Sequence, residues 1–254
     1  MSGGASSGSN LQNYLPDAYD RVARRFPALL VALPLLTPII CSFGAQHPVL
    51  MAVFGLFTAC GVLYLLGSVA RDRGKALEVR LVRKWGGMPS TRMLRHRDHT
   101  IERPTKARYH AAASKKLEIQ MPNAEEEQTD PSGADEIYKS VVSLLIQRTR
   151  DRGGLLLKEN MSYGFHRNML AMKGAGITTA VIGLLVGVLL SGLIGFRPFS
   201  FQPEGLSDLG LAAGITMFVS ASLLILWVSH IKESSVVVVS ESYARRLLEN
   251  LDDL

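Results

Sequence analysis

Three long blocks of the chain contain no Asp, Glu, Lys or Arg. They run over Phe26–Ala70, Gly174–Phe196 and Leu209–His230. A helix rises about 1.5 Å per residue and the apolar core of a bilayer is about 30 Å thick, so roughly 20 apolar residues span it. A soluble protein of buried helices would need a polar face on each helix, and these blocks have essentially none. The pattern therefore predicts a membrane protein.

The first block is long enough to cross a membrane twice, because it holds 45 residues with a reversal at Gly44, His47 and Pro48. We therefore expect a mainly α, polytopic membrane protein with four transmembrane helices and a small α(+β) cytoplasmic domain between the second and third. The four expected spans are Phe26–Phe43, Pro48–Ala70, Gly174–Phe196 and Leu209–Ile231.

The basic residues predict the orientation of these spans. Of the 28 Lys and Arg, 27 lie on one side of the expected membrane, and Arg197 lies on the other. Cytoplasmic flanks carry the excess of Lys and Arg, so both termini and the central region should be cytoplasmic. The expected order is a flexible N-terminus (1–25), a helical hairpin (26–70), a basic domain (71–173), a second hairpin (174–231) and a tail (232–254). The net charge of +6 follows from this asymmetry and is no nucleic-acid signature in itself.

Turn residues and apolar spacing divide the central region into short elements. The second span should continue as a basic helix through Arg71–Trp85, until Gly86, Gly87 and Pro89 stop it. Pro104–Lys116 reads as a helix, and Leu117–Met121 alternates apolar and polar residues as a strand does. The acidic run Glu125–Glu127 reads as a solvated turn.

The rest of the cytoplasmic part is expected to be helical, with one ambiguity. Ser132 and Asp135 resemble a capping box that opens a helix, and Leu155–Lys173 should lead into the third span. Ser235–Ser240 could extend a helix or form a strand against Leu117–Met121, since four β-branched residues favour a strand. Tyr243–Leu251 reads as an amphipathic helix that packs on the central region or on another subunit.

A dense polar stretch at residues 92–110 supplies the candidate site for a ligand or a partner. Three interpretations compete: a basic flank on anionic lipid, a receptor for a phosphate-bearing nucleotide or nucleic acid, and a metal site at His96, Asp98, His99 and either His110 or His166. No metal-ligand spacing is complete, so no metal is assigned. The candidate residues are Arg92, Arg95, His96, Arg97, His99, Arg103 and Arg108.

The third span carries small residues at every fourth position: Gly183, Gly187, Ser191 and Gly195. This spacing creates a groove in which another helix backbone can approach closely. The partner helix could belong to the same chain or to a second subunit, and we predict a homo-oligomer that packs in part through these four residues.

Signals of catalysis and of ion transport are missing from the sequence. No nucleophile elbow, phosphate-binding loop, dinucleotide fingerprint or zinc-protease motif occurs, so neither an enzyme nor a cofactor is predicted. The expected spans hold no charged residue, whereas proton relays and voltage sensors need one at membrane depth. Cys41 and Cys60 lie in the spans and read as small apolar residues.

The layout of spans and domain is similar to that of small bacterial membrane effectors that act beside a cytosolic sensor, including those of antiphage defence. The first hypothesis is therefore an oligomeric protein of the bacterial inner membrane whose cytoplasmic domain receives a soluble protein or a phosphate-bearing signal and alters membrane permeability. The second is a non-conducting membrane anchor or scaffold that recruits a soluble enzyme or a nucleic-acid-binding partner. Expected partners are the lipid bilayer, further copies of the chain, a soluble cytoplasmic protein and a nucleotide or nucleic acid.

Overall fold

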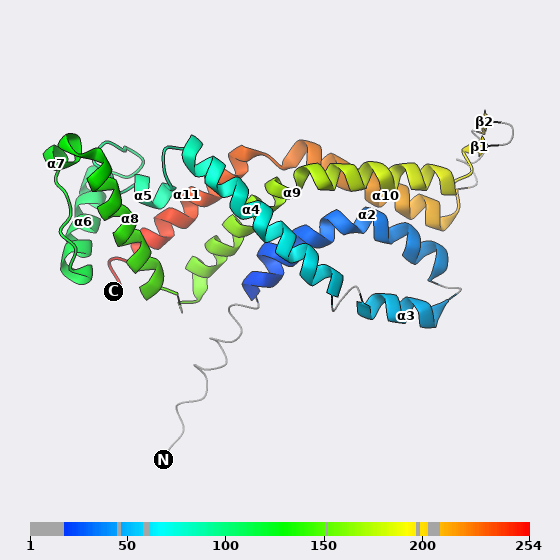
Figure 1. Ribbon diagram of the computed structural model, residues 1–254, viewed down its shortest axis with the longest axis horizontal. Helices are drawn as coiled ribbons and strands as arrows, with labels where there is room; N and C mark the ends of the chain where they lie inside the picture. Colours follow the sequence, from blue (N-terminus) through cyan, green and yellow to red (C-terminus); the bar gives the residue numbers. More distant parts are fainter. Residues whose placement is uncertain (1–17, 45–46, 58–60, 151, 197–198, 203–208) are drawn as a thin grey trace, which may run out of the picture. The chain divides into compact units, whose positions relative to one another are not determined.

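The computed structural model describes residues 18–44, 47–57, 61–150, 152–196, 199–202 and 209–254, and nearly all of its elements are helices (Figure 1). The chain divides into two units. Unit 1 contains Ala76–Tyr163 and Ser234–Leu254, and unit 2 contains Asp20–Lys75 and Gly164–Glu233. Two long helices, α4 (Leu63–Lys84) and α9 (Gly154–Leu190), contribute residues to both units.

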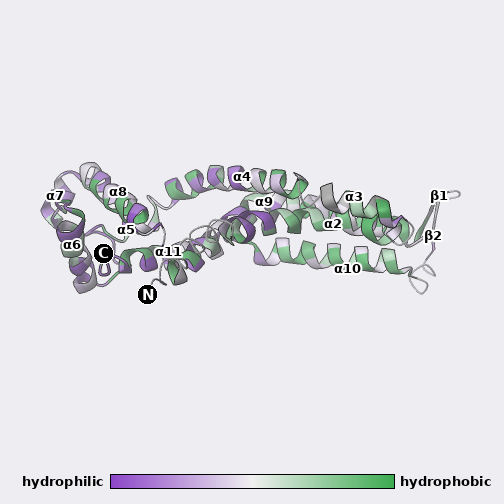
Figure 2. Cartoon of the chain, turned by 90° about the horizontal axis from the view of Figure 1, so that it is seen from below, coloured by the Kyte–Doolittle hydropathy of each residue, from purple (hydrophilic) through white to green (hydrophobic). Residues whose placement is uncertain are grey.

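Among the described residues, three helical stretches are long and apolar enough to cross a membrane: Ala18–Phe43, Gly154–Leu190 and Leu211–His230. The first joins a π-helical turn, η1 (Arg21–Arg25), to α2 (Phe26–Phe43). The last joins α10 (Leu211–Ile225) to a second π-helical turn, η4 (Leu226–His230). Figure 2 colours α2, α10 and the apolar half of α9 mostly green, whereas α6 and α7 are largely purple. The chain is thus compatible with a multi-pass membrane protein.

The expected second span, Pro48–Ala70, falls on two described helices. Its first part is α3 (Pro48–Phe57), and its last part is the beginning of α4. Residues 58–60 between them lie outside the described residues, so a fourth crossing stays a prediction. The expected continuation into a basic helix is confirmed, since α4 runs to Lys84 and the chain then turns at Gly86 and Gly87, both with positive φ.

Helix α9 ends at Leu190, six residues before the expected end of the third span at Phe196. The Ser191 hydroxyl donates to the carbonyl of Val188 and accepts from the amide of Leu193, and Gly192 adopts a φ of +72° that favours glycine. These contacts complete the helix end. Strands β1 (Ile194–Phe196) and β2 (Phe199–Phe201) follow as an antiparallel pair.

Unit 1 is a bundle of short helices around its own apolar core. Its further elements are α5 (Pro89–Arg92), α6 (Arg103–Leu117), α7 (Ala124–Thr129), α8 (Pro131–Arg148) and α11 (Glu233–Glu249). The core joins Leu94, Tyr138 and Leu145 to the C-terminal Leu247 and Leu251. The C-terminal helix therefore packs on the central region of its own chain.

The strand predicted at Leu117–Met121 is wrong. Leu117 ends α6, Glu118 takes a left-handed conformation with φ of 58°, and the following residues form no ladder. The alternation is nevertheless real as a burial pattern, because Leu117, Ile119 and Met121 all contact the core. Its only proposed partner, Ser235–Ser240, is helical within α11, so this extended segment has no strand to pair with.

Two local assignments at the acidic run are also wrong. Glu125–Glu127 is part of helix α7, not a solvated turn, and the Glu127 side chain is buried. The capping box lies at Asn123 and Glu126 instead of Ser132 and Asp135. Helix α8 begins two residues earlier than that box implied, with Pro131 in its first turn and the Asp130 carboxylate accepting from the Gly133 amide. Asp135 therefore does not cap α8, and its carboxylate instead accepts hydrogen bonds from Arg95.

Candidate functional site

The loop that carries the predicted basic site is folded around one buried carboxylate. Glu127, only 2% exposed, accepts hydrogen bonds from the backbone amides of His96 (2.7 Å) and Arg97 (3.3 Å) and from the Tyr138 hydroxyl (2.6 Å). The Arg97 guanidinium lies 3.3 Å from the same carboxylate. Burial alone would raise the pKa of Glu127, but these donors outweigh it and hold the pKa below its ordinary value.

Arg95 forms the strongest ion pair of this loop. Its Nε and Nη2 atoms each donate over 2.8 Å to the two oxygens of Asp135, and Nη2 also donates to the Gly86 carbonyl over 2.8 Å. The two side chains are 12% and 21% exposed, so solvent screens the pair only in part. This fork-to-fork contact ties the turn after α4 to helix α8.

Two further predicted arginines also contact carboxylates of unit 1. Arg97 lies 3.2 Å from Asp135, and Arg92 lies 3.4 Å from Asp98. Asp98 in turn accepts from the Thr100 amide at 2.8 Å, and although its burial acts in the opposite direction, these contacts lower the pKa of Asp98. The three arginines that the sequence proposed as phosphate ligands therefore have anionic partners within the fold.

The histidines of the stretch hydrogen-bond to backbone carbonyls. His96 Nε2 lies 3.0 Å from the Pro122 carbonyl oxygen and His110 Nε2 lies 2.7 Å from that of Leu94, with the two rings nearly perpendicular at 4.8 Å. Burial lowers the pKa of His110. Buried Lys106 donates to the carbonyls of Arg95 and Asp98. Across the described residues no three His, Cys, Asp or Glu are placed to hold a metal ion.

The other predicted residues lie on the surface of unit 1. His99 and Arg103 are exposed. Arg108 lies 3.2 Å from Asp252 and lines a hollow of about 730 Å³ between α6 and α11. The hollow is lined by Ile101, Glu102, Thr105, Arg108, Tyr109, Arg245 and Glu249. Charges of both signs lie beside apolar atoms there.

The small residues of α9 contact helices of their own chain. A Cβ atom on Gly183 would lie 2.8 Å from the Pro34 carbonyl oxygen of α2 and would meet the Ser220 hydroxyl of α10. A Cβ on Gly187 would lie 2.5 Å from Met217 Cγ of α10. The groove is thus filled within the subunit at these two positions. Ser191 ends α9, and Gly195 lies in β1 opposite Ser200, so the four residues do not form one continuous helical groove.

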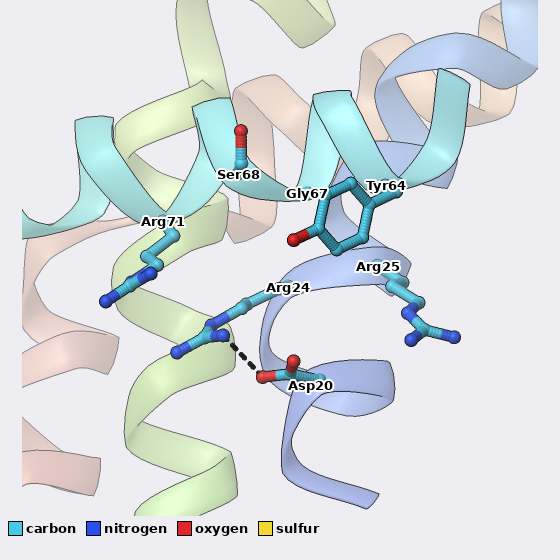
Figure 3. A pocket seen from close by; sticks show the side chains of 7 residues that line it. All are labelled: Asp20, Arg24, Arg25, Tyr64, Gly67, Ser68 and Arg71. Atoms are coloured by element: carbon cyan, nitrogen blue, oxygen red, sulfur yellow. Dashed lines mark ion pairs between the residues drawn. The ribbon is translucent and has the colours of Figure 1, made fainter. Parts of the chain in front are cut away.

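Unit 2 contains a second hollow that the sequence reasoning did not single out (Figure 3). It is an open hollow of about 380 Å³ between the start of the first apolar helix and α4. Its lining residues are Asp20, Arg24, Arg25, Tyr64, Gly67, Ser68 and Arg71. A signal was present in the sequence, because Arg24, Arg25 and Arg71 flank the two ends of one charge-free block. That signal was used only to orient the spans.

Comparisons with protein-family models, curated proteins and solved structures find no match to this chain.

Proposed function

We propose that this protein is a non-conducting scaffold of the bacterial inner membrane that recruits a soluble protein partner through unit 1. In this proposal four spans anchor the chain, and both termini and unit 1 are cytoplasmic, in accordance with the distribution of 27 of the 28 basic residues. The partner docks on the hollow between α6 and α11, where Arg108 and Glu249 offer charges of both signs.

The observation that carries this proposal is the internal pairing of the basic loop. A phosphate-bearing signal would have to displace Asp135 from Arg95, and such a charge-assisted two-point contact contributes about 1.5–3 kcal/mol. Arg97 would likewise leave Glu127 and Asp135. The loop is therefore better suited to hold the domain together than to capture a small anion, which favours a scaffold over a signal-gated effector.

The polar groups of the apolar helices support a non-conducting role. The hydroxyls of Thr37 and Thr216 donate over 2.7 Å to carbonyls of their own helices, at Leu33 and Ala212. The hydrogens of these two hydroxyls are therefore not available to solvate a permeating anion, while their oxygen lone pairs stay open. Large apolar side chains, among them Leu185 and Phe218, are exposed on these helices, as contact with lipid tails requires.

The two functions differ in what the purified protein does to a bilayer. We expect liposomes that contain the full-length protein to retain a trapped dye and an imposed potassium gradient as well as empty liposomes do. A protein-dependent leak, alone or on addition of nucleotides, would favour the permeability effector and contradict the scaffold. Reporter fusions at Arg92 and Leu254 test the orientation, because both should be active only with a cytoplasmic reporter.

Recruitment is tested at the surface itself. A photocrosslinking amino acid at Thr105, which lines the hollow, should give a discrete adduct in cells, whereas the same amino acid at exposed Lys139 of α8 should not. Arg108→Gln should reduce the Thr105 adduct, while Lys115→Gln, an equal charge change on the same helix, should leave it intact. Equal adducts at Thr105 and Lys139 would contradict a specific docking surface.

A further inference from the structure

The hollow of Figure 3 is formed by two segments that approach closely at a glycine. Gly67 of α4 is buried, and a Cβ atom there would lie 3.8 Å from the Cβ of Arg24. The side chain of Arg24 is thus packed against α4 near its base. In Figure 3 Arg24 and Arg71 extend toward the same side of the hollow, while Arg25 extends toward the other.

The lining of the hollow changes from charged to apolar along both segments. Arg71 follows the charge-free block, and Tyr64, seven residues earlier on α4, lies roughly 10 Å deeper along the helix axis at 1.5 Å per residue. Phe26 follows Arg25 directly and is 47% exposed, and Tyr64 is 67% exposed. Arginine beside tyrosine and then an apolar surface is the sequence of layers found across a membrane interface.

The hollow carries a net positive charge, because three guanidinium groups and one carboxylate line it. Asp20 lies 2.5 Å from Arg24, so one carboxylate already holds one of the three guanidinium groups in the hollow. Arg71 is exposed and forms no hydrogen bond or ion pair with any described residue. An anion bound there gains a guanidinium that can contact two of its oxygens at once. The hydroxyl of Tyr64 lines the same space and can donate to a further oxygen, whereas that of Ser68 already donates to the Leu65 carbonyl over 3.0 Å.

We propose that this hollow binds the phosphate ester of an anionic phospholipid from the cytoplasmic leaflet. Arg71 contacts the phosphate oxygens, while Arg24 stays paired with Asp20 and adds positive charge beside it. The Tyr64 hydroxyl donates to the ester region, and an acyl chain lies along Phe26. The proposal depends on the membrane location of unit 2 and not on the scaffold role of unit 1. A soluble phosphate ester shares the headgroup chemistry but lacks the acyl chain, so the two sources can be separated.

The test measures lipid retention by the full-length protein with native mass spectrometry, from detergent that contains phosphatidylglycerol or phosphatidylcholine. The double variant Arg24→Gln and Arg71→Gln is compared with Arg73→Gln and Lys75→Gln, which removes the same charge from exposed positions of α4 outside the hollow. The loss of contacts and short-range attraction in the hollow, at about 1 kcal/mol for each arginine, corresponds to roughly a 10–30-fold fall in phosphatidylglycerol binding in the first variant. The control residues do not line the hollow and lose only screened long-range attraction, so we expect a fall of under about threefold there.

The outcomes distinguish a specific lipid-binding site from nonspecific attraction to a basic surface. A selective loss of phosphatidylglycerol binding in the hollow variant supports the proposal, and a Tyr64→Phe variant should then show a smaller loss in the same direction. An equal loss in both double variants would overturn it, because any two cations at the interface would then serve. Displacement of the lipid by millimolar glycerol 3-phosphate would overturn the lipid assignment and transfer the site to a soluble ester. Leak or recruitment measurements do not enter this test, so its failure is separate from that of the scaffold proposal.

Discussion

Each unit of the protein has a buried polar side chain that is supplied with hydrogen-bond partners, and the two units use different groups to do so. In unit 1 the charged Glu127 is held by two backbone amides, a phenol and a guanidinium. In unit 2 the fully buried Asn168 of α9 donates to the Ala23 carbonyl over 2.6 Å and accepts from Arg167 at 3.3 Å. One cluster buries a carboxylate, whereas the other is centred on a neutral amide.

The difference follows from where spare backbone donors are available. The loop at His96 and Arg97 is not helical, so its amides are free to stabilise an anion. In unit 2 the backbone amides are used within helices, and Asn168 instead meets a carbonyl of the π-helical turn Arg21–Arg25. Gly74 of α4 makes room for it, because a Cβ atom there would collide with the Asn168 amide oxygen. Irregular backbone thus decides which polar side chain can be buried.

The largest effect is expected from removing the buried carboxylate of unit 1. Glu127→Ala leaves the Tyr138 hydroxyl, two amides and the Arg97 guanidinium without their acceptor, at a cost of about 3–5 kcal/mol. Hydrogen exchange of the full-length protein should show α6, α7 and α8 opening together. The exposed Glu125→Ala on the same helix serves as the control and should leave exchange nearly unchanged. Equal protection in both variants would contradict the role of Glu127 as the centre of the cluster.

The predicted site arginines should separate into structural and surface residues. Arg95→Gln breaks the two-point contact with Asp135 and should destabilise unit 1 by about 1.5–3 kcal/mol. Arg108→Gln removes an exposed pair with Asp252 and should cost under about 1 kcal/mol. Hydrogen exchange of α8 measures the loss of stability in each of the two variants. If nucleotide binding, and not exchange, changed in Arg95→Gln, the loop would be a receptor site after all.

The packing of unit 2 is tested by a pair of glycines on one helix. A Cβ atom on Gly176 would lie 2.6 Å from the ring atom Cζ2 of buried Trp227, whereas one on Gly174 would meet nothing within 4 Å. Gly176→Ala should therefore destabilise the detergent-solubilised protein by about 1–3 kcal/mol, and Gly174→Ala should not. Half-inactivation temperatures from heating followed by size exclusion measure the difference, at roughly 2–4 °C for each kcal/mol.

Heat stability and particle mass, measured on the Gly183→Ala variant, test whether α9 packs within the chain or between subunits. Because Gly183 contacts Pro34 and Ser220 of its own chain, Gly183→Ala should lower stability while the mass of the particle stays unchanged. A drop in particle mass at unchanged stability would instead place Gly183 and the other small residues of α9 at a contact between subunits, as their spacing allows.

Sequence reasoning located helices well and contacts poorly. Charge-free blocks and glycine or proline stops are local signals, and they placed α2 and α6 to within a residue of their observed ends. The strand at Leu117–Met121 failed because alternation reports which side chains face a core and not whether a neighbouring strand exists. Likewise the spacing of Gly183 and Gly187 predicts close packing without naming the partner helix.

The site was harder to predict because its partners are distant in the chain. A run of arginines looks the same whether it awaits a phosphate or is already paired, and Asp135 lies 40 residues from Arg95. Glu127 was interpreted as solvated because acidic runs usually are, and only the tertiary fold brings Tyr138 and the His96 amide to it. The hollow at Arg24 and Arg71 required knowing that α4 approaches the first span at Gly67.

The smallest expected effect is a dependence of unit 1 on mild acid through His110. Burial lowers the pKa of His110, so the folded state binds a proton less readily than the unfolded chain, whose histidine titrates near 6.5. The facing groups include His96, Lys106 and Glu127, and the first two add to the shift while the carboxylate opposes it. Stability is therefore complete above the unfolded pKa and declines as pH falls below it, by at most about 0.7 kcal/mol between pH 7 and pH 6 for one such group. His110→Gln keeps a donor for the Leu94 carbonyl but has no proton to gain, so this decline should vanish in hydrogen exchange of α6 after correction for the intrinsic rate. A decline of the same size in the variant would show that His110 is not its source. Glu127 and Asp98 could not replace it, because their pKa values are lowered and their contributions are lost only below about pH 4.5.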